Sequence, residues 1–196
     1  MKIVHLIAGI ALSATPSLAE ETTQLDAHEH GVGQLNIAFD ENKIAMELHA
    51  PGADIVGFEY GAKSDVDLAA IDAALQTLSD PLGLFLIPEA ASCIVITAHA
   101  KLESEDSDHD DHDEEGHDDH DEEGHDDHDK APGHTEFHAE YLLECANLTE
   151  ISAITFSYFE IFPNALELEV QVISDKGATA FEIERDVAKL DLRGIF

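Results

Sequence analysis

Six regularly spaced histidines stand in a strongly acidic stretch of this sequence. Residues 103–129 contain seventeen Asp or Glu, six His, and no Lys, Arg or apolar side chain. The eight residues Asp111–Asp118 are repeated without change as Asp119–Asp126, and a third copy begins at Asp127. Each imidazole stands beside carboxylates, and the spacing alternates between three and five residues: His109, His112, His117, His120, His125 and His128.

Imidazole and carboxylate groups together form a donor set for divalent cations. Neutral imidazole suits zinc, copper and nickel, while carboxylate oxygens suit harder cations. A flexible chain can wrap an ion with two or three imidazoles and a carboxylate, but it loses chain entropy, so each site is weak to moderate. The stretch therefore predicts several exchangeable sites for Zn2+, with Cu2+ or Ni2+ as alternatives.

Two other interpretations of the stretch are weaker. A solvated acidic tether without a metal role gives no reason for six regularly placed histidines. A calcium site of the EF-hand or RTX type needs a D-x-[DN]-x-[DN]-G or G-G-x-G-x-D pattern, which the repeat lacks, and calcium does not use imidazole. Metal binding through imidazole is the better hypothesis.

Six more histidines lie after residue 20 and outside the repeat. His28 and His30 are two residues apart, so both imidazoles point to the same side of an extended chain. His138 shares the polar face of an expected strand with Glu136 and Glu140. We predict a more ordered site that includes the first two of these histidines, and we treat all six as candidate ligands: His28, His30, His49, His99, His134 and His138.

Two cysteines, Cys93 and Cys145, stand on either side of the acidic stretch. An isolated pair in an exported protein usually forms a disulfide, whereas thiolate zinc sites normally use C-x₂₋₄-C pairs. We therefore predict a Cys93–Cys145 disulfide, with thiolate metal ligands as the alternative. If the flanking strands pair antiparallel with the cysteines opposite each other, His99 faces Ala139 and His138 lies on the other side of the sheet. The two histidines then share an ion only if a bulge or bend intervenes.

The N-terminus has the features of a secretory signal peptide. Residues 3–12 are largely apolar after Lys2, and Ser17 and Ala19 place small side chains just before a cut at residue 20. The apolar run is shorter than the roughly 20 residues of a membrane-spanning helix. We expect residues 1–19 to be removed and residues 20–196 to be exported as a single metal-binding domain, without membrane insertion.

The net charge of −34 at pH 7, with only nine Lys and Arg, excludes some classes of partner. Nucleic acids and anionic membrane surfaces both need clustered cationic side chains. The sequence has no H-E-x-x-H, G-x-S-x-G or Walker motif, so it does not indicate an enzyme. A catalytic zinc with an open position is the remaining enzymatic alternative. Cations are the natural ligands of so acidic a chain.

Hydrophobic periodicity predicts an α+β domain, mainly an antiparallel β-sheet with one main helix. Alternating apolar residues predict a hairpin over 31–50, with its turn at 40–42. Apolar residues at helical spacing predict a helix over 65–79, capped by Ser64 and ended near Pro81. The apolar but irregular segment 81–90 suggests a loop over the core. Further strands are expected at 92–100, 135–146, 152–160, 165–174 and 178–184, in an order that the sequence does not give.

The acidic stretch interrupts this domain between the strands at 92–100 and 135–146. It has no apolar side chain to bury and its charges repel one another, so we expect residues 103–134 to form a disordered insert. We call these residues the acidic insert.

Several short motifs resemble the ZrgA-like proteins, a family first described as a domain of unknown function. The likeness covers nearly the whole chain after residue 19 and includes a single Cys on either side of a His-rich insert. Tyr60 stands where the family pattern often has His, so a ligand role is not carried over to it. The motifs that carry the resemblance are His28-Glu29-His30-Gly31, Gln34-Leu35-Asn36, Ala50-Pro51-Gly52, Val56-Gly57-Phe58-Glu59, Asp80-Pro81 with Leu84-Phe85, and Phe159-Glu160 with Phe162-Pro163.

The resemblance implies a periplasmic zinc-binding protein of a Gram-negative bacterium, associated with zinc acquisition and a membrane metal transporter. Joined to the residue-level argument, it gives the hypothesis that the acidic insert captures Zn2+ and a more ordered histidine site holds one ion for transfer. The alternative is a passive divalent-metal buffer or metal-resistance protein with no delivery role. That alternative predicts many weak sites, all of them in the insert.

Overall fold

The computed structural model describes residues 29–104 and 134–195. The predicted signal peptide, His28 and the six histidines of the repeat lie outside the described residues. Within them the order of elements is β1 (Val32–Asp40), β2 (Lys43–Pro51), α1 (Gly52–Ile55), α2 (Asp65–Leu78), α3 (Pro81–Leu84), β3 (Phe85–Leu86), η1 (Glu89–Ala91), β4 (Cys93–Ser104), β5 (Thr135–Cys145), η3 (Leu148–Glu150), β6 (Ala153–Phe156), α4 (Tyr158–Ile161), β7 (Glu167–Ser174), β8 (Gly177–Glu184), η4 (Arg185–Val187) and β9 (Lys189–Asp191).

A six-stranded sheet with the order β4-β5-β2-β1-β7-β8 is the main structural layer. The predicted hairpin forms its centre, with Phe39 paired to Ile44 next to the turn. All neighbouring strands are antiparallel except β1 and β7, which run parallel. The expected α+β fold, built mainly on an antiparallel sheet with one main helix, is confirmed.

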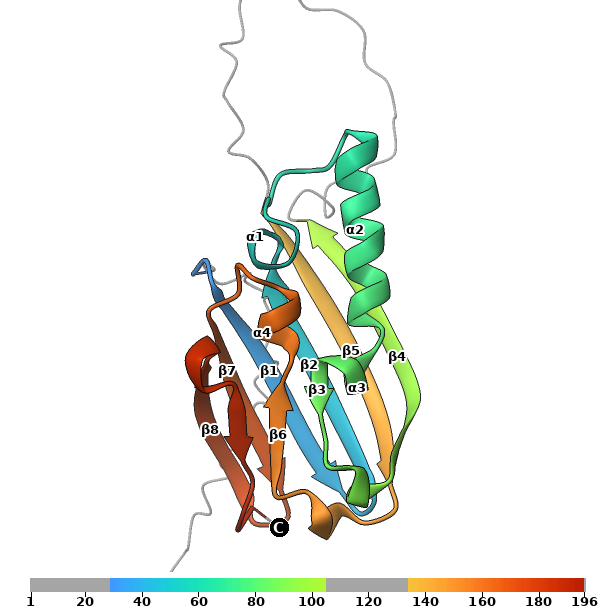
Figure 1. Cartoon of the computed structure of the whole chain (residues 1–196), viewed down its shortest axis with the longest axis vertical. Coiled ribbons are helices and arrows are strands. Elements are labelled where there is room, and N and C mark those ends of the chain that lie inside the picture. The colour runs from blue at the N-terminus through green and yellow to red at the C-terminus, as the bar shows by residue number, and fades with distance from the viewer. Residues whose placement is uncertain (1–28, 105–133, 196) are drawn as a thin grey trace, which may run out of the picture.

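One face of the large sheet carries the hydrophobic core. Alternate residues of β1, β2, β5 and β7 point inward and are almost fully buried, for example Leu35, Leu48 and Leu168. Helices α2, α3 and α4 and the small sheet of β3, β6 and β9 lie against this face (Figure 1). The main helix is capped as predicted, since the Ser64 side chain accepts a hydrogen bond from the Asp67 amide.

Two segments on this side differ from the sequence-based expectation. The segment 81–90 is not an irregular loop, because it contains α3 and β3, and β3 pairs with β6. The strand expected over 152–160 ends at Phe156 and is followed by α4. A helical turn there buries Tyr158, Phe159 and Phe162 together, which an alternating strand would not do.

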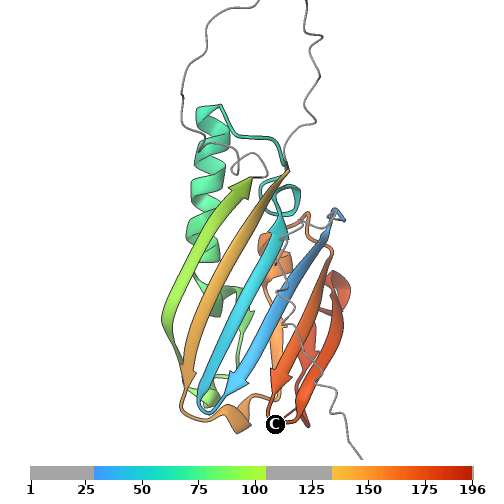
Figure 2. The ribbon, with the colours of Figure 1, turned by 180° about the vertical axis from the view of Figure 1, so that it is seen from behind.

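The opposite face of the large sheet is its outer face, and no helix or strand lies in front of it in Figure 2. The polar residues that alternate with the core residues project there, and glutamates predominate among them. A face that is both uncovered and acidic attracts cations. The glutamates on this face are Glu47, Glu103, Glu136, Glu140, Glu144, Glu167, Glu169, Glu182 and Glu184.

The register between β4 and β5 differs from the expected one because β4 contains a bulge. Cys93 pairs with Cys145 as predicted, but the register shifts between Val95 and Thr97. His99 consequently faces Glu140 instead of Ala139. A register shift of one residue turns every later side chain of β4 to the other face of the sheet. His99 and His138 therefore both project from the outer face. Strand β4 also runs on through Ser104, two residues into the predicted acidic insert.

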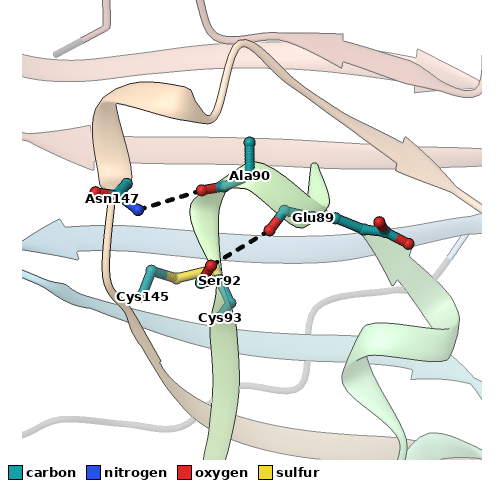
Figure 3. The surroundings of a disulfide bond; sticks show 6 residues. All are labelled: Glu89, Ala90, Ser92, Cys93, Cys145 and Asn147. Carbon is teal, nitrogen blue, oxygen red and sulfur yellow. Dashed lines mark hydrogen bonds between the residues drawn. A yellow bond between two sulfur atoms is a disulfide. The ribbon is translucent and has the colours of Figure 1, made fainter.

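The predicted disulfide joins Cys93 and Cys145 (Figure 3). It links the first residue of edge strand β4 to the last residue of β5, and Cys145 is fully buried. Next to it, the Asn147 side chain donates a hydrogen bond to the Ala90 carbonyl at 3.3 Å. The bridge and this bond hold β4 and β5 together at the end of the strand pair that lies farthest from the acidic insert.

We expect the double variant Cys93→Ala/Cys145→Ala to lose about 4 kcal/mol of unfolding free energy, the chain-entropy value for a closed loop of this size. The two cysteines are 52 residues apart in the sequence. Urea unfolding of the oxidised wild type and the variant measures the difference, and the reduced wild type is the control. Equal urea midpoints for the oxidised wild type and the variant would show that the bridge adds no stability.

Candidate metal centre

Strands β2 and β5 bring two histidines together on the outer face of the large sheet. His49 and His138 are direct partners in the antiparallel pairing, and their ring centroids lie 4.1 Å apart. Glu136 precedes His138 by two residues on β5, so both side chains project from the same face. We call His49, Glu136 and His138 the His–Glu site.

One carboxylate oxygen lies between the two imidazoles. Oε2 of Glu136 is 2.5 Å from Nε2 of His138 and 3.5 Å from Nδ1 of His49. The three residues each offer a ligand atom, and these atoms all lie within 4.8 Å of one another. In a tetrahedral zinc site with bonds of about 2.0–2.1 Å, ligand atoms stand about 3.3 Å apart. Small side-chain adjustments would therefore let the three residues surround one ion.

The His–Glu site is partly enclosed by protein. The side chain of Glu136 is 9% exposed and that of His138 is 16% exposed. Nε2 of His138 is buried and has no hydrogen-bond partner among the described residues, because its close approach to Glu136 lacks hydrogen-bonding geometry. A buried nitrogen without a hydrogen bond costs free energy, and a cation placed between nitrogen and carboxylate removes that cost.

The carboxylates around His49 control its protonation. The hydrogen bond to Glu136 raises the pKa of His49; burial opposes that effect, and a second hydrogen bond, to Glu47, adds to it. In return, the hydrogen bond from His49 lowers the pKa of Glu47. In the metal-free protein the imidazole is thus stabilised in its charged form, and a metal ion must displace that proton.

A further carboxylate reaches the site from β4. Oε2 of Glu103 lies 3.3 Å from Nε2 of His138, and its other oxygen forms an ion pair with Lys101. The hydrogen bond from Lys101 lowers the pKa of Glu103, so this carboxylate is ionised at neutral pH. Glu103 is therefore placed to hold a water bound at the fourth position of the metal.

Two imidazoles and a carboxylate form a donor set typical of zinc. Three protein ligands leave one position of a tetrahedral ion open, which allows exchange with water or another ligand. The site lies where β4 ends and β5 begins, because Glu103 and Glu136 are cross-strand partners. It is thus held by the same strand pair that flanks the acidic insert.

The other proposed histidines that the structure describes lie in two places. His99 is exposed on the outer face and lies outside the His–Glu site. His30 and His134 both contact Glu59, at 3.0 and 2.8 Å. Burial raises the pKa of Glu59, but the hydrogen bonds from His134 and His30 outweigh it, and the net effect is a lowered pKa.

Three carboxylates with positions in these clusters were not among the residues proposed from the sequence: Glu59, Glu103 and Glu136. The spacing Glu136-x-His138 on one strand face is a signal that could have suggested Glu136 as a ligand. The pairing with His49 depends on β2 lying beside β5, and no local sequence pattern reveals which distant strands are neighbours.

Within the described ranges, no helix is long and apolar enough to cross a membrane. The fold and the site define a disulfide-bonded α+β domain with a candidate His–Glu metal centre on an open, acidic sheet face. A family model described as "ZrgA family zinc uptake protein" matches residues 27–192. This chain belongs to the ZrgA family, as its sequence motifs suggested. A comparison with curated proteins found no match.

Proposed function

We propose that this chain is a periplasmic zinc-binding protein that captures Zn2+, holds one ion at the His–Glu site and supports zinc acquisition by a membrane transporter. Zinc is its cargo. The family description is one of uptake, and we propose no catalytic role.

The position of Glu136 between two imidazoles is the observation that carries this proposal. A buried carboxylate shared by two imidazoles binds a cation with charge as well as with nitrogen ligands. The open fourth position suits an ion that must be released again. A site for permanent structural zinc normally closes all four positions with protein ligands.

We propose that the acidic insert raises the local supply of ions beside this site. Its six regularly spaced histidines offer weak sites, as argued from the sequence. Ser104, the last residue of β4, and Thr135, the first residue of β5, are cross-strand partners one pair removed from Glu103 and Glu136. Ions bound along the insert are thus tethered to the strand ends that carry the His–Glu site.

The disulfide fits an exported protein, because such bridges form and persist in oxidising compartments. Export by removal of residues 1–19, a periplasmic location and delivery to a transporter belong to this proposal. The net charge of −34 favours cations as ligands.

Native mass spectrometry of a chain lacking residues 105–129 tests the proposal. This deletion keeps Glu103 and leaves five residues, 130–134, to join the paired Ser104 and Thr135, a length typical of hairpin connections. The shortened chain is loaded with zinc and then challenged with a chelator of moderate affinity. The matched control is the same chain with His49→Gln.

We expect the shortened chain to retain zinc and the His49→Gln control to lose one ion relative to it. That result supports an ordered site that can hold an ion for transfer. If the shortened chain retains no zinc, all binding resides in the insert. The passive buffer then becomes the better interpretation of this protein.

A further inference from the structure

A second group of metal-ligating side chains surrounds Glu59, which follows α1. Oε2 of Glu59 is 3.0 Å from Nε2 of His30 and 2.8 Å from Nδ1 of His134. One carboxylate oxygen again contacts two imidazoles, although the three ligand atoms are spread more widely than the 4.8 Å of the His–Glu site. We call His30, Glu59 and His134 the Glu59 cluster.

The carboxylate of this cluster is shielded while its histidines are accessible. The Glu59 side chain is 13% exposed, whereas those of His30 and His134 are 66% and 52% exposed. A partly shielded anion with two solvent-facing imidazoles is open to an ion arriving from solution. The attraction of the anion for a cation is screened less than at a fully exposed position.

The backbone next to His30 is fixed by several contacts of Gly31. The Gly31 amide donates a hydrogen bond of 2.8 Å to Oδ1 of Asp54, which is 2% exposed. Gly31 has a φ of +90°, a backbone conformation that favours glycine. The Gly31 carbonyl accepts hydrogen bonds from Leu166 and Glu167.

Asp54 also brings negative charge close to the cluster. Its other oxygen, Oδ2, is buried without a hydrogen-bond partner among the described residues. Burial raises the pKa of the Asp54 carboxyl to about 6, and the hydrogen bond from Gly31 opposes this effect. The cluster therefore has an anchored backbone on one side and a second buried carboxyl nearby.

The two groups of ligands are arranged in sequence along β5. His134 directly precedes the strand, and Glu136 and His138 follow it at intervals of two residues. Residues two apart on an extended chain project from the same side, about 7 Å from one another. The last residue of the Glu59 cluster and the first β5 residue of the His–Glu site are therefore neighbours.

We infer that His30, Glu59 and His134 form a second Zn2+ site, which binds an ion at the end of the acidic insert beside the His–Glu site. The inference rests on the proposed zinc function for the identity of the ion. The full protein thus holds two ordered ions, one bound in part by His134 and the other in part by Glu136. The Glu59 cluster is the more exposed of the two sites, so an ion from the insert reaches it first.

Imidazole ¹⁵N NMR of the full chain labelled at histidine tests this inference. Zinc is added stepwise, and the signals of His30, His134, His49 and His138 are identified through single His→Gln variants. The test variant is Glu59→Gln, which keeps the size of the side chain and removes its charge. The matched control is Glu29→Gln, because Glu29 neighbours His30 in the sequence, whereas the carboxylate that both histidines contact is that of Glu59.

We expect zinc to convert His30 and His134 to the metal-bound form in the wild type. In Glu59→Gln this conversion should need zinc concentrations at least ~10-fold higher, because loss even of a group that only supports a metal ligand costs 10–100-fold in affinity. The response of His49 and His138 should not change in either variant, which also shows that the fold is intact. If only His49 and His138 respond in the wild type, or if Glu59→Gln leaves His30 and His134 unaffected, the second site is overturned and the proposed function stands. If neither pair responds, both fail.

Discussion

The substitution Glu136→Gln is expected to weaken zinc binding at the His–Glu site by about 100-fold or more. The change keeps the size of the side chain but removes the negative charge that lies between His138 and His49. Loss even of a group that only supports a metal ligand typically costs 10–100-fold in affinity, so loss of a ligand's charge should cost at least the upper end of that range. Competition with a chromophoric zinc chelator, using the chain that lacks residues 105–129, measures the affinity.

The matched control for this experiment is Glu140→Gln. Glu140 lies on the same strand and the same face, four residues further along, and it is exposed opposite His99 and Glu47. The control should bind zinc nearly as the unsubstituted chain does. Equal losses in the two variants would mean that the general negative charge of the sheet face, and not a ligand, holds the ion.

The local parts of the fold could be predicted because local patterns determine them. Strands β1 and β2 alternate apolar and polar residues around a short turn, and α2 has a Ser64 cap and helical spacing. Two local predictions were wrong: the loop over segment 81–90 and the end of the strand expected over 152–160. In both places short elements of a few residues are set by packing onto the core, and such elements leave no period to detect.

The site could be predicted only in part, because it depends on strand neighbours. The sequence suggested metal-binding histidines and a polar face for His138, but the pairing of β2 with β5 joins residues about ninety positions apart. Because His28 lies outside the described residues, the predicted pairing of His28 with His30 in one site stays a prediction. His30 itself contacts Glu59 and not the His–Glu site.

The bulge in β4 shows why register was hard to infer. A disulfide fixes one pair of residues, Cys93 with Cys145, but a single unpaired residue further along moves His99 to the other face. Bulges are common at sheet edges, where they discourage pairing with other chains, and β4 is an edge strand. The correct face for His99 still does not make it a ligand of the His–Glu site.

Zinc retention at the His–Glu site is expected to fall by at least ~10-fold between pH 7.5 and pH 5.5. Protons and zinc compete for the same imidazole nitrogens, and an ordinary histidine has a pKa of about 6.5. Hydrogen bonds to Glu136 and Glu47 raise the pKa of His49 in the metal-free protein, so its competition with zinc begins at a higher pH than for a free imidazole. Zinc affinity measured by chelator competition across this range, on the chain lacking residues 105–129, checks the prediction.

The zinc-free protein should respond to pH in the opposite direction. A histidine whose pKa is raised by folding adds stability that is present below about pH 6.5 and is lost as pH rises through the folded pKa. Urea unfolding without zinc should therefore show this contribution shrinking toward pH 8, in the range where zinc binding becomes stronger.

The variant Glu47→Gln separates protonation of His49 from loss of a ligand. Glu47 bonds to His49 at 3.2 Å but is outside the three-residue site, so its removal lowers the pKa of His49 and leaves the ligands in place. Its zinc affinity at pH 8 should match that of the unsubstituted chain, while the fall in affinity should begin at a lower pH. Retention that is undiminished at pH 5 in both proteins would rule out imidazole coordination at this site. The ion would then be held by carboxylates alone, and the preference for zinc would lose its chemical basis.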